Sequence, residues 1–109
     1  MSDGRCEARF TRRYDAPVEE VWLALTDPAS VANWLAPPAG VETARSEAGR
    51  LLELDWTPRG EPRSVVRIEL SAEGDRTLLV VDHRRIDAAL GMRYMRDWSH
   101  ALDRLGGAL

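Results

Sequence analysis

The chain has 109 residues, 44% of them apolar, and a formal net charge of −3. This length is that of one domain with a single core, so we treat residues 1–109 as one domain. All fifteen cations are Arg, and they form no basic patch dense enough to predict nucleic-acid binding.

The sequence also limits compartment and cofactor. No segment reaches the ~18 consecutive apolar residues of a membrane span, and the first residues lack the apolar run of a signal peptide. Cys6 is the only cysteine, which excludes an internal disulfide and fits a reducing environment. We therefore expect a cytoplasmic protein. The two histidines have no third ligand at a useful spacing, and no phosphate loop or dinucleotide motif is present, so we expect no metal and no cofactor.

Residues 6–14 alternate in the manner of a strand. Cys6, Ala8, Phe10 and Tyr14 share one face of this strand. Arg12 is a cation on the same apolar face, so it either turns outward at a bulge or lies in a cavity.

Two short helices follow this strand. Pro17 can begin the first, because the missing N–H of proline costs nothing at a helix start. Its buried stripe is predicted to be Val18, Val21, Trp22 and Leu25. Asp27 ends the first helix before Pro28 and can cap a second, which runs to Leu35.

The middle of the chain contains three clear strands, at residues 50–56, 64–70 and 77–85, joined by turns that contain Gly and Pro. The alternation turns one set of apolar residues inward: Leu52, Leu54, Trp56, Val66, Ile68, Leu70, Leu79, Val81 and His83. Residues 41–47 are weaker and fit either a short edge strand or a loop. We expect a sheet of four or five antiparallel strands.

The last segment, from Ile86 to Leu109, has the period of an amphipathic helix. Asp87 is its predicted N-cap, and Gly106 and Gly107 mark its end. One stripe carries Gly91, Met95, Trp98, Leu102, Leu105 and Leu109. Antiparallel strands followed by a long helix indicate an α+β fold in the order β-α-α-β-β-β-α. The predicted core includes Trp22, Trp56, Trp98, Leu102 and Leu105.

Three stretches resemble a known family. The run Tyr14–Pro28 followed by Trp34, the strand Arg76–His83, and Trp98 with Leu102–Leu105 resemble the activator of heat-shock protein 90 ATPase-like proteins. That family belongs to the START/SRPBCC superfamily, with the polyketide cyclase-like proteins. The resemblance implies a helix-grip fold, in which a curved antiparallel sheet grips the C-terminal helix around a cavity. It also implies that the first strand pairs with the strand ending at His83.

The middle of the chain departs from the family pattern. Only about ten residues separate the helix pair from the strand at residues 50–56, where family members usually have two further strands. We therefore expect a shortened helix-grip domain with its middle strands reduced.

Six residues form the candidate ligand site: Arg12, Trp56, His83, Tyr94, Met95 and Trp98. Together they could line a groove for an apolar ligand with an anionic end, to which Arg12 would bind. The alternative is that the aromatics and Met95 fill the core and Arg12 turns outward. His83 could bind a ligand or act as an acid or base, or simply be satisfied inside the core. His100, Glu53 and Asp55 are expected on solvated faces.

Three functions remain open from the sequence. The first is a binding module for an apolar metabolite or lipid. The second is a chaperone-linked or other protein-interaction module. The third is a weak cyclase or hydrolase that uses His83. We assign no catalytic residue and leave enzymatic activity undecided.

A homodimer is also predicted. Without the missing strands, the strand at residues 50–56 would lie at the sheet edge or be covered only by residues 41–47, and open edges pair with other chains. An apolar patch of Leu51, Val65, Leu78 and Val80 on the outer sheet face would add to the interface.

Overall fold

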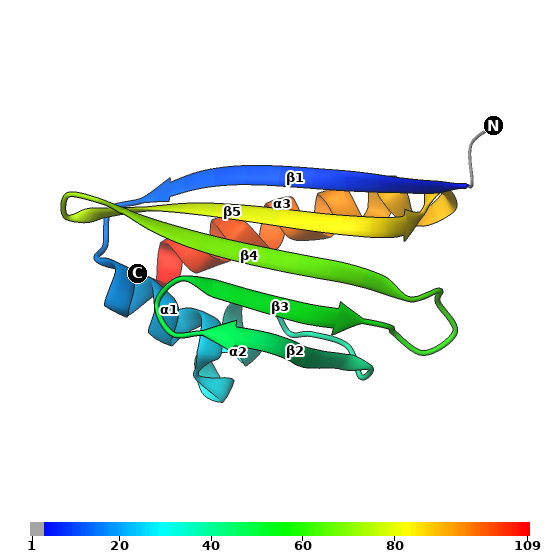
Figure 1. Ribbon diagram of the computed structural model, residues 1–109, viewed down its shortest axis with the longest axis horizontal. Helices are drawn as coiled ribbons and strands as arrows, with labels where there is room; N and C mark the ends of the chain where they lie inside the picture. The colour runs from blue at the N-terminus through cyan, green and yellow to red at the C-terminus, as the bar shows by residue number, and fades with distance from the viewer. Residues whose placement is uncertain (1–3) are drawn as a thin grey trace.

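The computed structural model describes residues 4–109. Its elements follow the chain in this order: β1 (Arg5–Tyr14), α1 (Val18–Thr26), α2 (Pro28–Trp34), β2 (Val41–Glu47), β3 (Leu51–Trp56), β4 (Ser64–Glu73), β5 (Arg76–Asp87), a 3-10 turn (Ala88–Leu90) and α3 (Gly91–Ala108). The strands form one antiparallel sheet in the order β1-β5-β4-β3-β2. The helices lie behind this curved sheet, with α3 behind β1 and β5 (Figure 1). The predicted α+β helix-grip architecture is confirmed.

The two ends of the chain meet across the sheet, as predicted. β1 pairs with β5, which places Phe10 opposite Val81 and Tyr14 opposite Thr77. The Tyr14 hydroxyl donates a 2.8 Å hydrogen bond to the carbonyl of Leu102 on α3. The first strand is therefore fixed both to the last strand and to the last helix.

The weak segment at residues 41–47 is a strand, β2, which adds one strand to the predicted order. It pairs with β3 along its length, so β3 lies inside the sheet and β2 forms the edge. Leu51, Leu52 and Leu54 of β3 are 0%, 6% and 7% exposed. The open β3 edge that was one reason to expect a homodimer is thus closed.

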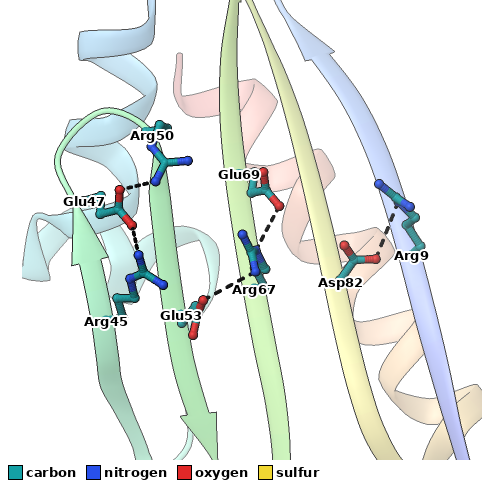
Figure 2. Close-up of polar contacts among 8 residues, drawn as sticks. All are labelled: Arg9, Arg45, Glu47, Arg50, Glu53, Arg67, Glu69 and Asp82. Carbon is teal, nitrogen blue, oxygen red and sulfur yellow. Dashed lines mark hydrogen bonds and ion pairs between the residues drawn. The ribbon is translucent and has the colours of Figure 1, made fainter.

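The outer face of the sheet is covered by ion pairs, which Figure 2 shows from the side opposite the helices. The pairs are Arg9–Asp82, Arg45–Glu47, Arg50–Glu47, Arg67–Glu53 and Arg67–Glu69. Between these side chains Leu51 is fully buried, and Val65, Leu78 and Val80 are half-buried. The predicted apolar patch is therefore interrupted by charge. The homodimer itself stays a prediction.

The final helix begins later than predicted. β5 continues through Ile86 to Asp87, and α3 starts only at Gly91. Asp87 is indeed a cap, but of the intervening 3-10 turn, where its carboxylate accepts from the amide of Ala89 at 2.9 Å. The helix also passes through Gly106 and Gly107 to Ala108. Its buried stripe contains Gly91, Tyr94, Trp98, Ala101, Leu102 and Leu105, whereas Met95 is 49% exposed.

The core around the three helices contains most of the predicted residues. Trp56, Trp98, Leu102 and Leu105 are buried. Trp22 is only half-buried, because α1 turns Val21, Ala24 and Leu25 most deeply toward the sheet. Trp34 of α2 is buried in the core instead, and its Nε1 donates to the carbonyl of Ala24 at 2.8 Å. Asp27 caps α2 as predicted, accepting from the amide of Ser30 at 3.1 Å.

A bulge in β5 resets its alternation. Between the pairs Ala8–His83 and Cys6–Ile86, β5 has two residues where β1 has one. Arg85, one of the two, has a left-handed backbone with φ of 61°. The extra residue allows both His83 and Ile86 to face inward, where they are 0% and 1% exposed. The bulge therefore positions His83 below α3 while keeping the end of β5 buried.

Among residues 4–109, no helix combines the length and the apolar character needed to cross a membrane. Within the same residues, no cluster of three His, Cys, Asp or Glu side chains could hold a metal ion.

Candidate ligand-binding site

His83 lies at the centre of a buried hydrogen-bond chain. The hydroxyl of Ser64 donates to the carbonyl of Trp56 at 3.0 Å, so its oxygen is free to accept from His83 Nε2, 2.8 Å away. The indole N–H of Trp98 donates to His83 Nδ1 at 2.9 Å. These two contacts fit only a neutral imidazole with its proton on Nε2.

Burial lowers the pKa of His83 from its ordinary value of 6.5 to about 4. The Trp98 bond acts in the same direction, since a proton on Nδ1 would remove its acceptor. Both ring nitrogens are thus engaged, and the side chain is fully buried. At neutral pH His83 orients Trp98 and Ser64 and is closed to a ligand.

Three aromatic side chains pack around this imidazole. Tyr94 stacks on it with ring centres 5.0 Å apart and planes at 16°. Trp56 meets its edge at 5.5 Å and lies 5.5 Å from Trp98. The bulged strand β5, the end of β3 and the inner face of α3 thus bring residues from three separate segments into one aromatic wall.

This wall borders a pocket of about 370 Å³, here called the α3 pocket. It lies between α3, the end of α2 and the β3–β4 loop, and its lining includes Trp56, Tyr94, Trp98, Glu61 and Arg93. The carboxylate of Glu61 accepts from the Tyr94 hydroxyl and pairs with Arg93 at 2.5 Å. Glu61 therefore fastens the β3–β4 loop to α3 at this pocket.

Tyr94 keeps its proton at this position. Burial, followed by the hydrogen bond and charge of Glu61, raises the pKa of Tyr94 to about 12. The Arg93 guanidinium lies 5.2 Å from the centre of the Tyr94 ring, in the range of a cation–π contact. The pocket thus presents the neutral phenol of Tyr94 beside its aromatic wall, together with the Glu61 carboxylate, whose charge is balanced by Arg93.

The remaining polar side chains of the α3 pocket come from α3 itself. Asp97, His100 and Arg104 also line it, and Arg104 Nε donates to the carbonyl of Trp34 at 3.0 Å. With Glu61 and Arg93, the lining has two acidic and two arginine side chains, so the signs are balanced. The indole N–H of Trp56 is buried and has no hydrogen-bond partner among the described residues.

A second space, here called the α2 cavity, lies between α1, α2 and the inner face of β2 and β3. Its volume is about 520 Å³, and Leu25, Val31, Leu52, Leu54 and Ile68 line it. Only a few polar residues, such as Thr43 and Ser46 of β2, reach its wall. It is therefore the more apolar of the two spaces.

The structure brings together three of the six predicted site residues. Trp56, Tyr94 and Trp98 line the α3 pocket. His83 lies behind them and lines neither space, and Met95 is on the outer side of α3. Arg12 stays on β1, where its guanidinium lies 5.8 Å from the Phe10 ring, away from both spaces. The bulge that would have turned Arg12 outward lies instead between Cys6 and Ala8. Arg12 pairs regularly with Leu79 and stays half-buried on the inner face of β1, so neither of its two predicted placements is observed.

Sequence reasoning missed the polar residues of the pocket. Arg93 precedes Tyr94 directly, so its proximity to the site could have been noticed. Glu61 lies in a segment that the sequence predicts only as a turn, and it meets Tyr94 across 33 positions. Hydrophobic periodicity predicts which residues of a strand or helix face the core, but it does not predict the contacts of a loop residue such as Glu61.

Comparison with solved structures agrees with this architecture. The crystal structure of CalU16 from Micromonospora echinospora is 32% identical to the chain, with a TM-score of 0.81, and the match covers 94% of this chain and 80% of CalU16. The chain belongs to the START/SRPBCC superfamily of helix-grip proteins. No protein-family model matches it, and no curated protein matches its sequence.

Two other helix-grip structures are similar. DynU16, from the dynemicin biosynthetic locus, is 25% identical over 92% of this chain and 45% of its own, with a TM-score of 0.78. An AHSA1-like protein from Rhizobium etli is 21% identical over 94% of this chain and 80% of its own, with a TM-score of 0.76. At that identity the latter shows the shared fold alone.

Proposed function

We propose that the protein is a binding module for a compact apolar metabolite, held in the α3 pocket. The observation that carries this proposal is the wall of Trp56, Tyr94 and Trp98 beside the Glu61–Arg93 pair. The pocket volume of about 370 Å³ falls in the range of small-molecule sites, which combine apolar walls with a few fixed polar groups.

The lining favours a particular ligand chemistry. Aromatic faces and edges favour a ring, which can stack on or meet the edge of Trp56 and Trp98. Because the two acidic side chains offset the two arginines, a neutral hydroxyl or carbonyl substituent suits the pocket better than the anionic end expected from Arg12. A lipid chain would need the α2 cavity as well.

The two other functions have less support. An acid or base role for His83 conflicts with its buried position and its two engaged nitrogens, so a cyclase or hydrolase would need another group. A protein-interaction module would be favoured by an apolar outer face, and the outer sheet face instead carries ion pairs. Within the superfamily, the opening motif Tyr14–Pro28 supports a shortened member of the activator of heat-shock protein 90 ATPase-like family.

The experiment is a calorimetric titration with small phenols, aromatic acids and short fatty acids. We expect phenols to bind more tightly than acids of the same size. Tyr94→Phe, which removes only the hydroxyl, and Arg93→Ala should weaken phenol binding about five- to tenfold, the effect of losing one polar contact.

Matched controls lie close to these residues. Arg96→Ala, on the exposed side of α3, and Arg12→Ala and Met95→Ala, outside the pocket, should leave the affinity unchanged. If every phenol, acid and fatty acid fails to bind at millimolar concentration, the function proposed here is wrong. If Arg12→Ala weakens binding as much as Arg93→Ala does, the ligand occupies a different place.

A further inference from the structure

The α3 pocket and the α2 cavity both border one short segment of chain, residues 35–38. Leu35 lines both spaces, Ala36 and Pro38 line the α3 pocket, and Pro37 lines the α2 cavity. Side chains of this segment therefore point alternately to the two sides. Among the described residues, Leu35 alone contributes to both linings.

The other large side chains at this boundary are held by polar contacts. Trp34 is tied to the carbonyl of Ala24, and Trp98 is tied to His83. Both indoles are buried, and their ring centres lie 6.5 Å apart. These contacts fix the two indoles on either side of the boundary. Leu35 is half-buried and has only apolar contacts to hold its side chain.

The backbone of the segment is held in place. The amides of Leu35 and Ala36 both donate to the carbonyl of Val31 at 2.9 Å, closing the end of α2. Ala36 adopts a left-handed conformation with φ of 46°, which a residue with a Cβ rarely takes. Pro37 and Pro38 follow and restrict the chain further. A change in the size of the Leu35 side chain should therefore alter the boundary without moving the segment.

We propose that Leu35 is the specificity-determining residue that limits ligand length, because its side chain closes the α3 pocket against the α2 cavity. This inference rests on the proposed function. The wild-type protein then accepts a ring with short substituents, and a longer apolar substituent is stopped at Leu35. With a smaller side chain at this position, the same substituent would enter an apolar space of about 520 Å³.

The test uses 4-alkylphenols, from 4-methylphenol to 4-octylphenol, titrated by calorimetry. With the wild-type protein, affinity should rise over the first few carbons and then level off. With Leu35→Ala, affinity should keep rising about three- to fourfold for each further methylene, the gain expected from burying one CH₂ group. The two proteins should bind 4-methylphenol with affinities within about threefold.

Two variants control for unrelated effects of the mutation. Leu23→Ala removes a leucine side chain that is 61% exposed on α1, and it should reproduce the wild-type series. Val31→Phe, placed in the Leu35→Ala protein, fills the α2 cavity from α2 and should restore the levelling-off. Thermal melting verifies that each variant is folded. Leu35→Val, a smaller truncation, should extend the rise by fewer carbons and replaces Leu35→Ala if the latter unfolds.

The outcomes separate this inference from the proposed function. If short phenols bind but Leu35→Ala and wild type give the same chain-length series, Leu35 does not divide the spaces and the inference is overturned. If Val31→Phe leaves the extended series unchanged, the longer chains do not enter the α2 cavity, which also overturns it. Failure of all phenols to bind any variant overturns the proposed function, and this inference with it.

Discussion

The two halves of the sheet support their helices in different ways. In the half formed by β1, β5 and β4 under α3, the buried polar groups of Tyr14, Ser64, Thr77 and His83 all have partners. In the half formed by β3 and β2 under α2, Val31, Leu35 and Val41 are only half-buried and a cavity of about 520 Å³ remains. The half under α3 is packed so that its side chains have fixed positions, whereas the half under α2 contains the unfilled α2 cavity.

The difference follows from where the sheet ends. β2 is the last strand on its side, and its five central residues are exposed. Its contribution to the lining of the α2 cavity is Val41, Glu42, Thr43 and Ser46, and none of these side chains is large enough to fill the space. A site between the two halves therefore has one rigid wall, of Trp56 and Trp98, and one that substitution can reshape, at Leu35.

The largest expected effect comes from the packed half. Trp98→Ala removes a buried indole and leaves His83 Nδ1 without its donor, so it should lower the free energy of unfolding by about 3–5 kcal/mol. In thermal melts this is a loss of roughly 10 °C or more. Val31→Ala, in the other half, should cost about 1 kcal/mol because its side chain already borders space. If the two variants lost equal amounts of unfolding free energy, the two halves of the sheet would not differ in packing as described.

The second effect concerns pH. The unfolded chain protonates His83 near pH 6.5 and the folded protein only at about 4, so between these values the unfolded state binds more protons. The free energy of unfolding should therefore fall as the pH is lowered from 6.5 to 4, by about 3 kcal/mol from this residue. Chemical denaturation across this range measures the slope.

Two variants test whether His83 causes this dependence of the free energy of unfolding on pH. His83→Leu should be less stable at pH 7 but lose less stability on acidification, because the buried titrating group is gone. His100→Ala, whose side chain is exposed, should keep the wild-type slope. An unchanged slope in His83→Leu would mean that acidic side chains alone produce the effect.

A smaller effect, of opposite sign, is expected at the β5 bulge. Arg85 holds a left-handed conformation that costs a residue with a Cβ about 1 kcal/mol relative to glycine. Arg85→Gly should therefore raise the free energy of unfolding by up to about 1 kcal/mol, measured by denaturant titration. Arg84→Gly, at the neighbouring position without positive φ, should lower it. Destabilisation of similar size in both variants would show that the bulge does not strain Arg85.

The smallest effect is predicted on the outer face. Arg67 pairs with Glu53 at 3.7 Å and with Glu69 at 2.9 Å, but these side chains are partly exposed to water. Arg67→Met, which keeps most of the side-chain length, should change the free energy of unfolding by less than about 1 kcal/mol. Denaturant titrations at low and high salt test this, because the pairs should matter less at high salt.

Much of the fold could be predicted from the sequence, because its strands alternate clearly and its helices have apolar stripes and caps. Residues 52, 54 and 56 face inward as their alternation predicts, and Asp27 caps α2. The start of α3 could not be predicted, because Ile86 suits either a strand or a helix and only the bulge at Arg85 decides. The buried stripe of α3 is also rotated slightly from the predicted one, so that Tyr94 and Ala101 are buried and Met95 is 49% exposed.

The site was predictable only in part, for a related reason. Aromatic residues at apolar positions of strands and helices point inward, which placed Trp56, Tyr94 and Trp98 together. Whether an inward residue lines a space or fills the core depends on its tertiary neighbours, and for His83 these are Ser64 and Trp98. Arg12 lies on the edge strand β1, where a long side chain reaches water past the end of the core.

The homodimer is a separate prediction with a direct test. β2 is now the sheet edge through which two copies could pair, and its charges and its irregular register between Thr43 and Arg45 oppose such pairing. Light scattering at high concentration should give twice the 12.2 kDa of one chain if two copies pair. A mass of one chain would exclude the dimer.

The pairing of β1 with β5 also determines the order in which the chain can assemble during synthesis. Tyr14 lies opposite Thr77, so the first strand has no partner in the sheet until a further 63 residues have been made. At about 5–20 residues per second, that interval lasts roughly 3–13 s. Throughout it, Phe10 and Tyr14 belong to a ribosome-bound strand without its final neighbours. Assembly of the sheet on the ribosome therefore begins with the β2, β3 and β4 hairpins, and the first strand joins last.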